Sequence, residues 1–479
     1  MSLQSGSSQA YRSEIGSGTQ QSQEMQEEKQ DMSTIAEVVK LKEGTEVKFL
    51  AKIRTQQTLS PDDGSFIIFQ DPTGSIQGAL SRTTLEQVKW AKCVNPESLV
   101  QVTGTLQERH EPIRSVSNTE LEVAVHSIYM VNFAQGLLLD SYETPESPQE
   151  PLSTRVLDLR HPSNQALFRV RAMILRTFRQ MLDDQGFVEI HTPRLQPAAT
   201  EGGSETFEVS YYGRRAVLAQ SQQPANQMAI AAGFERVYEI GPVFRANSSK
   251  PQQDLTEYTS LDVGMALTQS YTDLIRVIDD ALKYVFATTQ SMPELQVIRA
   301  RWPGKGIEWL DKTPVIPFTE ALPILRNDCF DIERGGLSTR DEVQLGQLVK
   351  EKYMTDYYIL DELPANARPF DTHGAEGSSS RNFFNIFLRG HCICSGGQRK
   401  HDAQKLQKST EHAQTTEDEE EEEEQYLTGF DLGTSVPLEA SLCLESLVTI
   451  LLGLPDVRYA SLFHRDSKSL PERPSSPRH

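Results

Sequence analysis

The stretch FERVYEIGPVFRANSSKPQQDLTEYTSLD, from Phe234 to Asp262, decides the fold prediction for this chain. Its first part, EIGPVFRA, comes before the acidic segment LTEYTSLD. Around it, strand-like and helical segments alternate as far as Leu454 without a repeating strand–helix–strand unit. This mixed order favours an α+β fold over a parallel, doubly wound sheet.

Two further segments flank this stretch in a fixed order. GFVEIHTPRL (Gly186–Leu195) precedes it, and LESLVTILLGLPDVRYASLFHRD (Leu444–Asp466) follows it. Before the first of them, NQALFRVRAMILRTFRQMLDDQGF carries apolar residues at helical spacing, and Gly186 is a helix stop signal. The spacing therefore predicts a long amphipathic helix ahead of Gly186.

The N-terminal part of the chain has a different pattern. Short runs of alternating apolar residues follow one another: VKFLAKI, then SFIIFQDPTGSIQGAL with a Pro-Thr-Gly turn, then SLVQVTGTL, then LEVAVHSIYMVN. Closely spaced strands with turn residues between them are typical of a small β-barrel.

Composition sets the expected boundaries. A disordered tail is predicted over residues 1–33, a β-barrel domain over 40–135, a hinge over 136–160, a large α+β domain over 161–470 with an acidic low-complexity insertion over 403–425, and a tail over 471–479. The first tail is rich in Ser, Gly and Gln and cannot offset the entropy of ordering. Pro148 and Pro151 mark the hinge.

Charge and cysteine content exclude several classes of protein. The formal net charge of −20 argues against nonspecific attraction to a polyanion, although a local basic surface is compatible with it. Five cysteines spread along the chain do not form a disulfide framework. His391, Cys392 and Cys394 lack a second ligand pair at zinc spacing, so we interpret them as thiols on a strand and predict no metal site there. The chain has no apolar membrane span or secretory leader, and we expect a cytoplasmic protein.

The three segments resemble motifs 1, 2 and 3 of the class II aminoacyl-tRNA synthetases. Further segments are similar to the aspartate-specific, eukaryotic cytosolic or archaeal group of these enzymes. They are TEGGSETFEV, LAQSQQPANQM, DYYILDELPANARPF and FLRGHCICSGGQRKHD, together with SLFHRD at the end of the third motif. The resemblance covers residues 40–470. It implies an OB-fold barrel that reads a tRNA anticodon and a catalytic domain whose antiparallel sheet is flanked by helices. It also implies ATP and Mg²⁺ as cofactors, tRNA for aspartate as a partner, and a homodimer through motif 1, with Pro193 at the matching position.

The resemblance assigns roles to individual residues. The nucleotide would be held by Arg245, which contacts the α-phosphate and is the catalytic residue, by Glu257, and by Tyr258 under adenine. The amino acid would be held by Ser204, Gln223, Asp262 and Arg399. The anticodon would be bound by Phe66 and Gln77. Without the resemblance, Phe66 is a barrel-core side chain and the others are surface or structural polar groups.

Other family positions carry different residues. In the resemblance, Asn226 replaces a lysine that grips the aspartate carboxylate, and Asn247 and Asp254 replace a glutamate and a histidine. Asn385 and Cys392 replace the two carboxylates that bind Mg²⁺. A cluster of glycines has become Glu439, Ala440, Ser441 and Cys443, and Ser446 replaces the arginine on the γ-phosphate.

These replacements predict a loss of chemistry. Adenylate formation is mostly positioning and charge neutralisation, and an amide and a thiol are poor ligands for a hard cation. Side chains at former glycine positions should obstruct the nucleotide floor. We therefore expect the magnesium site to be lost and aspartylation to be weak or absent.

Several interpretations stay open at the level of sequence. The chain is a divergent but working aspartate–tRNA ligase, or a synthetase paralogue without ligation that binds tRNA or an active synthetase. A third hypothesis is an enzyme repurposed for another carboxylic acid. An error in the gene sequence over residues 400–446 would not account for Asn226, Asn247 or Asn385.

Overall fold

The chain forms two compact units, Met1–Glu143 and Thr144–His479. The computed structural model describes residues 32–60, 64–80, 94–108, 120–135, 155–156, 158–197, 206–246, 255–325, 337–364, 382–401 and 433–469. Most of the predicted tail, most of the hinge and the acidic insertion lie outside these residues. No helix within the described ranges is both long and apolar enough to cross a membrane.

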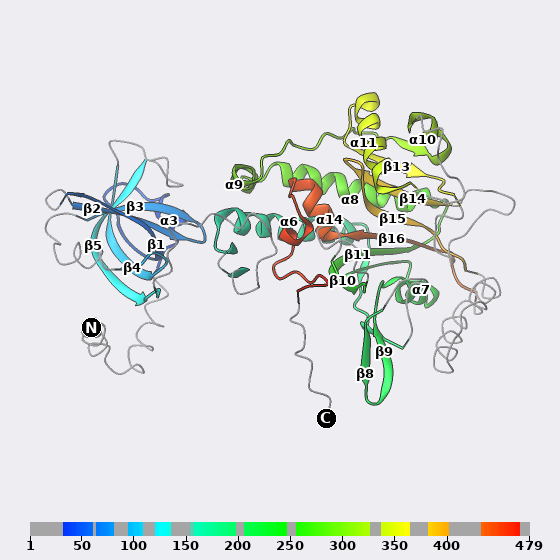
Figure 1. Ribbon diagram of the computed structural model, residues 1–479, viewed down its shortest axis with the longest axis horizontal. Helices are drawn as coiled ribbons and strands as arrows, with labels where there is room; N and C mark the ends of the chain where they lie inside the picture. Colours follow the sequence, from blue (N-terminus) through cyan, green and yellow to red (C-terminus); the bar gives the residue numbers. More distant parts are fainter. Residues whose placement is uncertain are drawn as a thin grey trace. The chain divides into compact units, whose positions relative to one another are not determined.

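The first unit is the predicted OB-fold barrel. Its strands are β1 (Glu46–Ser60), β2 (Gly64–Asp71), β3 (Gly74–Leu80), β4 (Leu99–Glu108) and β5 (Leu121–Asn132), closed in the order β1-β2-β3-β5-β4 (Figure 1). Alternate residues point inward, and the Phe49 and Phe69 rings meet edge to face with centroids 5.9 Å apart. The alternating apolar pattern is therefore confirmed as a barrel.

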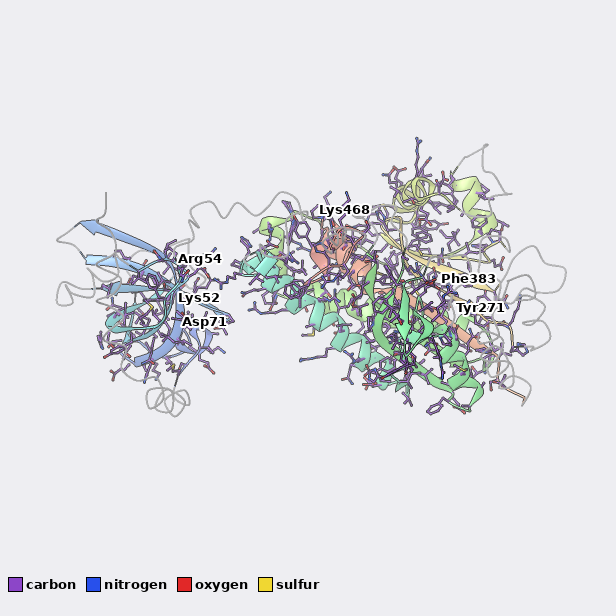
Figure 2. All side chains as sticks on the ribbon, turned by 60° about the horizontal axis from the view of Figure 1, so that its bottom comes forward. Lys52, Arg54, Asp71, Tyr271, Phe383 and Lys468 are labelled. Carbon is purple, nitrogen blue, oxygen red and sulfur yellow. The ribbon has the colours of Figure 1, made fainter. Side chains whose placement is uncertain are left out.

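A short helix, α3 (Ile35–Val38), packs its two buried end residues into the barrel core. Asp71, labelled in Figure 2, accepts hydrogen bonds from the Ile35 amide at 2.8 Å and the Thr73 amide at 2.7 Å. Ser33 also bridges Phe49. The residues between the predicted tail, which ends at 33, and the predicted barrel, which begins at 40, thus pack with the barrel. Four helical residues have no periodicity to detect, and the contact with Asp71 spans 36 positions of the sequence.

The second unit is built on an eight-stranded sheet with the order β12-β13-β14-β15-β16-β11-β10-β6. The strands are β6 (Val188–Glu189), β10 (Arg236–Phe244), β11 (Glu257–Ala266), β12 (Val315–Pro317), β13 (Tyr357–Asp361), β14 (Phe383–Leu388), β15 (His391–Gln398) and β16 (Pro437–Cys443). All neighbours are antiparallel except at the two edges. A separate ribbon contains β7 (Leu195–Gln196), β8 (Glu208–Tyr211) and β9 (Arg214–Leu218). The prediction of α+β with an antiparallel sheet is confirmed.

Helices supply the other layer of this unit. They are α6 (Pro162–Asp183), α7 (Gln223–Ala231), α8 (Thr272–Gln290), α9 (Glu294–Arg301), α10 (Phe318–Leu325), α11 (Thr339–Tyr353) and α14 (Leu444–Leu452), with the 3-10 helix η6 (Val457–Ala460). The main core joins residues of α6, α8 and α14 to one face of the sheet, with Phe178, Ile278 and Val448 against Leu261 and Leu442. That face is therefore closed to ligands. On the opposite face, α10 and α11 cover the β13–β14 end, where Leu325 and Leu345 pack with Tyr358 and Phe387, so a site belongs on the remainder of that face.

The predicted long helix is α6, which ends three residues before Gly186, a glycine with a φ of 77°. The predicted hinge, however, extends too far. Arg155 pairs with Asp158 and donates from Nη2 to the Ser461 carbonyl at 2.8 Å. Residues just before 160 are therefore part of the catalytic unit, because their charges are satisfied there rather than by solvent.

A glycine in β15 tests this packing. A Cβ at Gly396 would lie 2.7 Å from the Ala440 Cβ and 2.7 Å from the Glu439 carbonyl oxygen. Gly396→Ala should lower the free energy of unfolding by about 1–3 kcal/mol through overpacking. Gly304→Ala is the matched control, since the nearest atom there would be 3.7 Å away, and it should change stability by less than about 0.5 kcal/mol. Denaturant unfolding of the two variants gives the comparison, and equal stability would contradict the packing.

Candidate functional site

The site face of the large sheet carries a continuous row of polar side chains. The register pairs Glu239 with Asp262, Asp262 with Ser441, Ser441 with Ser395, and Ser395 with Asn385. Because side chains alternate across a strand, all five project from the face opposite the core. Residues from the motif 2 hairpin, β16 and the β14–β15 hairpin are therefore gathered in one line.

Glu239 ties the motif 1 segment to this row. Its carboxylate accepts from the Thr192 amide at 2.8 Å and the Thr192 hydroxyl at 2.7 Å, and it pairs with Arg194. The Glu239 side chain is completely buried, so the charge depends on these partners. Pro193, between the two, is exposed.

Asp262, between Glu239 and Ser441 in the row, is 1% exposed. Its Oδ1 accepts a hydrogen bond from the Ser260 hydroxyl at 3.0 Å and another from the Ser441 hydroxyl. Burial raises the pKa of Asp262 to about 7, the two serine hydroxyls lower it, and the nearby Glu239 charge raises it. The carboxylate therefore changes its charge close to neutral pH.

Arg399 and Glu439 form a buried ion pair next to the row. The Arg399 Nε lies 3.0 Å from the Glu439 Oε2, and the two side chains are 2% and 1% exposed. Arg399 also donates from Nη2 to the Gln223 Oε1 at 2.6 Å, and its guanidinium lies 6.0 Å from the ring centroid of Phe383, labelled in Figure 2. Gln227 donates from Nε2 to the same Glu439 oxygen at 2.9 Å.

Asn226 lies in α7 over the same part of the sheet. An ideal Cβ on Gly264 would be 3.4 Å from the Asn226 Cβ, and Gly264 pairs across the strands with Glu439. The Asn226 side chain is 1% exposed, and neither amide atom has a hydrogen-bond partner among the residues that the structure describes. The structure thus brings together four residues for which the sequence predicted a common site: Gln223, Asn226, Asp262 and Arg399.

The predicted nucleotide residues lie at the other end of the motif 2 hairpin. The Arg245 guanidinium lies 5.6 Å from the Tyr258 ring centroid, within cation–π range. Glu257 is exposed and forms a β-bridge with Arg465. Cys443 is the N-cap of α14, and Ser446 is the third residue of the helix, in its first turn.

The two predicted magnesium positions form a small hydrogen-bonded cluster. Ser395 donates to the Asn385 Oδ1 at 2.8 Å, and its hydroxyl lies 3.6 Å from the Cys392 Sγ. Among the described residues, no group of three or more His, Cys, Asp or Glu side chains is arranged to hold a metal ion. A neutral amide, a hydroxyl and a thiol do not fit Mg²⁺, which requires charged oxygen ligands.

One predicted replacement does not face the site. Ala440 is 1% exposed within the core, against Gly396 on β15. Only Glu439, Ser441 and Cys443 alternate onto the site face, so the prediction that all four residues cover the floor is wrong for Ala440. The cause is the two-residue period of the strand.

The barrel residues occupy the outer face of β2 and β3. Phe66 pairs with Ala79 and Gln77 pairs with Ile68, while Ile67 and Phe69 between them point into the core. Phe66 is half-buried and, by alternation with Ile67, lies on the outer face of the barrel. Gln77 donates from Nε2 to the Glu122 Oε2 at 2.9 Å.

Three predicted positions, Ser204, Asn247 and Asp254, lie outside the described residues. Three contributors were missing from the sequence prediction: Glu239, Ser395 and Gln227. The first two stand one strand away from predicted residues in the same row, which strand register reveals and linear spacing does not. Gln227 is next to Asn226 in α7, and only its contact with Glu439 distinguishes it.

A closed OB barrel, followed by an antiparallel sheet that contains the motif 2 hairpin and is packed against the motif 3 helix α14, defines a class II aminoacyl-tRNA synthetase. The family model described as tRNA synthetases class II (D, K and N) matches residues 147–467, and the OB-fold nucleic acid binding domain matches 47–131. The chain belongs to this class II family, and within it to the aspartate–tRNA ligases of the eukaryotic cytoplasmic type.

The relatives support that assignment along most of the chain. The cytoplasmic aspartate–tRNA ligase of Homo sapiens is 36% identical, with 85% of this chain and 84% of the relative covered. Cytoplasmic aspartate–tRNA ligase 1 of Arabidopsis thaliana is 31% identical, with 92% and 87% covered. The aspartyl tRNA synthetase structure from Entamoeba histolytica has a TM-score of 0.79 at 28% identity, covering 92% of each chain.

The raised pKa of Asp262 predicts a pH-dependent stability. The folded state favours the protonated acid, so stability is lost as pH rises from about 4, the ordinary value, through about 7. Asp262→Asn keeps an acceptor for both serines and removes the cost of burying charge. It should be more stable than the wild type above pH 7 by up to about 4 kcal/mol, because each pKa unit corresponds to about 1.4 kcal/mol.

Thermal unfolding at pH 4, 6 and 8 measures this difference. Asp184→Asn is the control, since that residue caps the end of α6 outside the site row. A constant gap between wild type and Asp262→Asn at all three pH values would contradict the pKa shift.

Proposed function

We propose that this chain is an aspartate–tRNA ligase relative that has lost efficient aspartate activation and works as a tRNA-binding protein in the cytoplasm, where its relatives act. The observation that carries the proposal is the pairing of the two amino-acid-binding charges with β16. Glu439 forms an ion pair with Arg399, and the Ser441 hydroxyl donates a hydrogen bond to Asp262. A substrate aspartate would have to displace both contacts.

The nucleotide side supports the same conclusion. Activation of an amino acid requires positive charge on the phosphates, which bound Mg²⁺ supplies in this family. Asn385, Ser395 and Cys392 satisfy one another and offer no charged oxygen, and Ser446 brings no cation. Arg245 remains, but one charge-assisted contact contributes only about 1.5–3 kcal/mol. The ATP and magnesium chemistry of the family is therefore inferred to be weak or lost.

The barrel supports the second part of the proposal, that the chain still binds tRNA. Phe66 is half-buried on the outer face, and OB barrels bind single strands by stacking bases on aromatic rings. Gln77 lies on the next strand, but it is 1% exposed and bonded to Glu122, so Phe66 is the side chain that carries this part of the proposal. tRNA for aspartate is the partner expected from the family. An active synthetase is a second expected partner.

We also infer a homodimer through motif 1. Val188 and Leu195 are large apolar side chains with 47% and 44% of their surface exposed, on either side of the exposed Pro193. These exposed apolar side chains lie on the segment to which the family resemblance assigns the dimer contact, and they are compatible with it.

A second candidate function is activation of an acid other than aspartate. It is favoured by the retention of Gln223 and Arg399 in direct contact, at 2.6 Å. A working, divergent aspartate–tRNA ligase is the remaining candidate, and the exchange of pyrophosphate into ATP separates the three.

Purified chain should show no aspartate-dependent exchange of pyrophosphate into ATP above background with Mg²⁺ present. The combined variant Asn226→Lys, Asn385→Asp, Cys392→Glu, Glu439→Gly, Ser441→Gly, Cys443→Gly and Ser446→Arg should gain exchange, because it restores the charges and removes the side chains from the floor. The same variant with Arg245→Ala is the control and should stay silent. Exchange by the wild-type chain at the rate of an active relative would refute the loss of activation.

Phe66→Ala should weaken binding of the anticodon stem-loop of tRNA for aspartate about five- to hundredfold, because stacking on one aromatic is worth about 1–3 kcal/mol per base. Tyr129→Ala is the matched control. It removes an exposed aromatic from β5, seven residues along the strand from the position that pairs with Gln77. Fluorescence anisotropy at fixed salt measures both, and equal losses would refute a specific role for Phe66.

A further inference from the structure

The Arg399–Glu439 pair is bonded to two carboxamides of the chain itself. Gln223 gives its amide oxygen to the guanidinium, and Gln227 gives an amide N–H to the carboxylate. A cation that donates and an anion that accepts, held side by side, match the two ends of a carboxamide. The chemistry around the pair therefore favours a neutral group that both donates and accepts.

Asn226 supplies an independent indication. Its side chain is almost completely buried, and its Nδ2 and Oδ1 are both without hydrogen bonds among the residues that the structure describes. Its carbons pack over Gly264, the cross-strand neighbour of Glu439. Buried polar groups in folded proteins are almost always bonded. A ligand beside Glu439 that offers one acceptor and one donor would satisfy both atoms.

A ligand carboxylate does not fit the same place. The positive charge of Arg399 already faces the carboxylate of Glu439 at 3.0 Å, so a second anion would lie next to a buried like charge. It would also bring no donor for the Asn226 Oδ1. The groups around Glu439 therefore disfavour an acidic side chain through both charge and hydrogen bonding.

We propose that Glu439 sets the specificity of this pocket, which takes an α-amino acid whose side chain ends in a neutral carboxamide and excludes one that ends in a carboxylate. Asp262, the next acidic residue on the site face, receives the ammonium group in place of the Ser441 hydroxyl. The inference rests on the proposed function, since it gives the reason why aspartate activation is lost and names what the pocket holds instead.

L-Asparagine and L-aspartate are suitable probes, because they have nearly the same shape and differ by an amide against a carboxylate. Calorimetric titration of the full chain at pH 8, where Asp262 is mostly ionised, should show L-asparagine binding at least about tenfold more tightly than L-aspartate, a difference of about 1.4 kcal/mol. Glu439→Gly leaves Arg399 without its anion and should reverse the order.

Glu439→Gln keeps the shape and removes the charge, so it should bring the two affinities to within about threefold of each other. Glu208→Gln is the matched control, since it removes the carboxylate of an exposed ion pair with Arg215 in the β8–β9 ribbon, and it should keep the wild-type preference. Thermal unfolding in each ligand reports whether the variants fold. Where Glu439→Gly fails to fold, Glu439→Gln and the wild-type titrations decide.

Binding of L-aspartate by folded wild-type protein as tightly as L-asparagine would overturn the specificity. Absence of L-asparagine binding by folded wild-type protein would overturn it as well, because the pocket would then be closed rather than selective. Both failures appear in equilibrium titrations without ATP. Failure of the proposed function appears instead as aspartate-dependent exchange of pyrophosphate, so the two results are distinguishable.

Discussion

The catalytic unit depends on the two-residue alternation of side chains along β11 and β16. One face of these strands carries Leu261, Val263 and Leu442 into the helical core. The opposite face carries Asp262, Glu439 and Ser441 into the site. Because the two faces share one backbone, a residue can change on the site face while the core keeps its packing. The fold of a synthetase can therefore persist with a different site chemistry.

Charge pairing is the second constraint on this face. Three buried carboxylates of the described site region are paired with arginines of the chain itself: Glu439 with Arg399, Glu239 with Arg194, and Glu445 with Arg171 at 2.7 Å. An unpaired buried charge is strongly unfavourable, so these pairs stabilise the folded state in the absence of substrate. Catalytic sites instead hold oriented charges for the transition state. In the Arg399–Glu439 pair, Glu439 neutralises the positive charge of Arg399 that would otherwise bind a substrate carboxylate.

The same alternation has a different outcome in the barrel. Ile67 and Phe69 fill the interior, and Phe66 keeps an outward position beside Gln77 on the next strand. The proposed loss of activation in one unit is therefore compatible with the proposed nucleic-acid binding by the other, because the two sites lie on different units.

The sequence by itself determined the family, the α+β class, the barrel strands and the long helix before Gly186, because periodicity and motif spacing are local properties. It also named Gln223, Asp262 and Arg399, but it missed Glu239, Ser395 and Gln227 beside them. It did not predict α3, which is only four residues long and, besides its local Thr34–Glu37 capping box, depends on a hydrogen bond from the Ile35 amide to Asp71, 36 positions away. It also assigned Ala440 to the site floor, whereas the register turns that residue into the core. Only the tertiary structure paired Arg399 with Glu439 and left the Asn226 amide unbonded, because distances between strands and a helix far apart in the chain are fixed by packing and register.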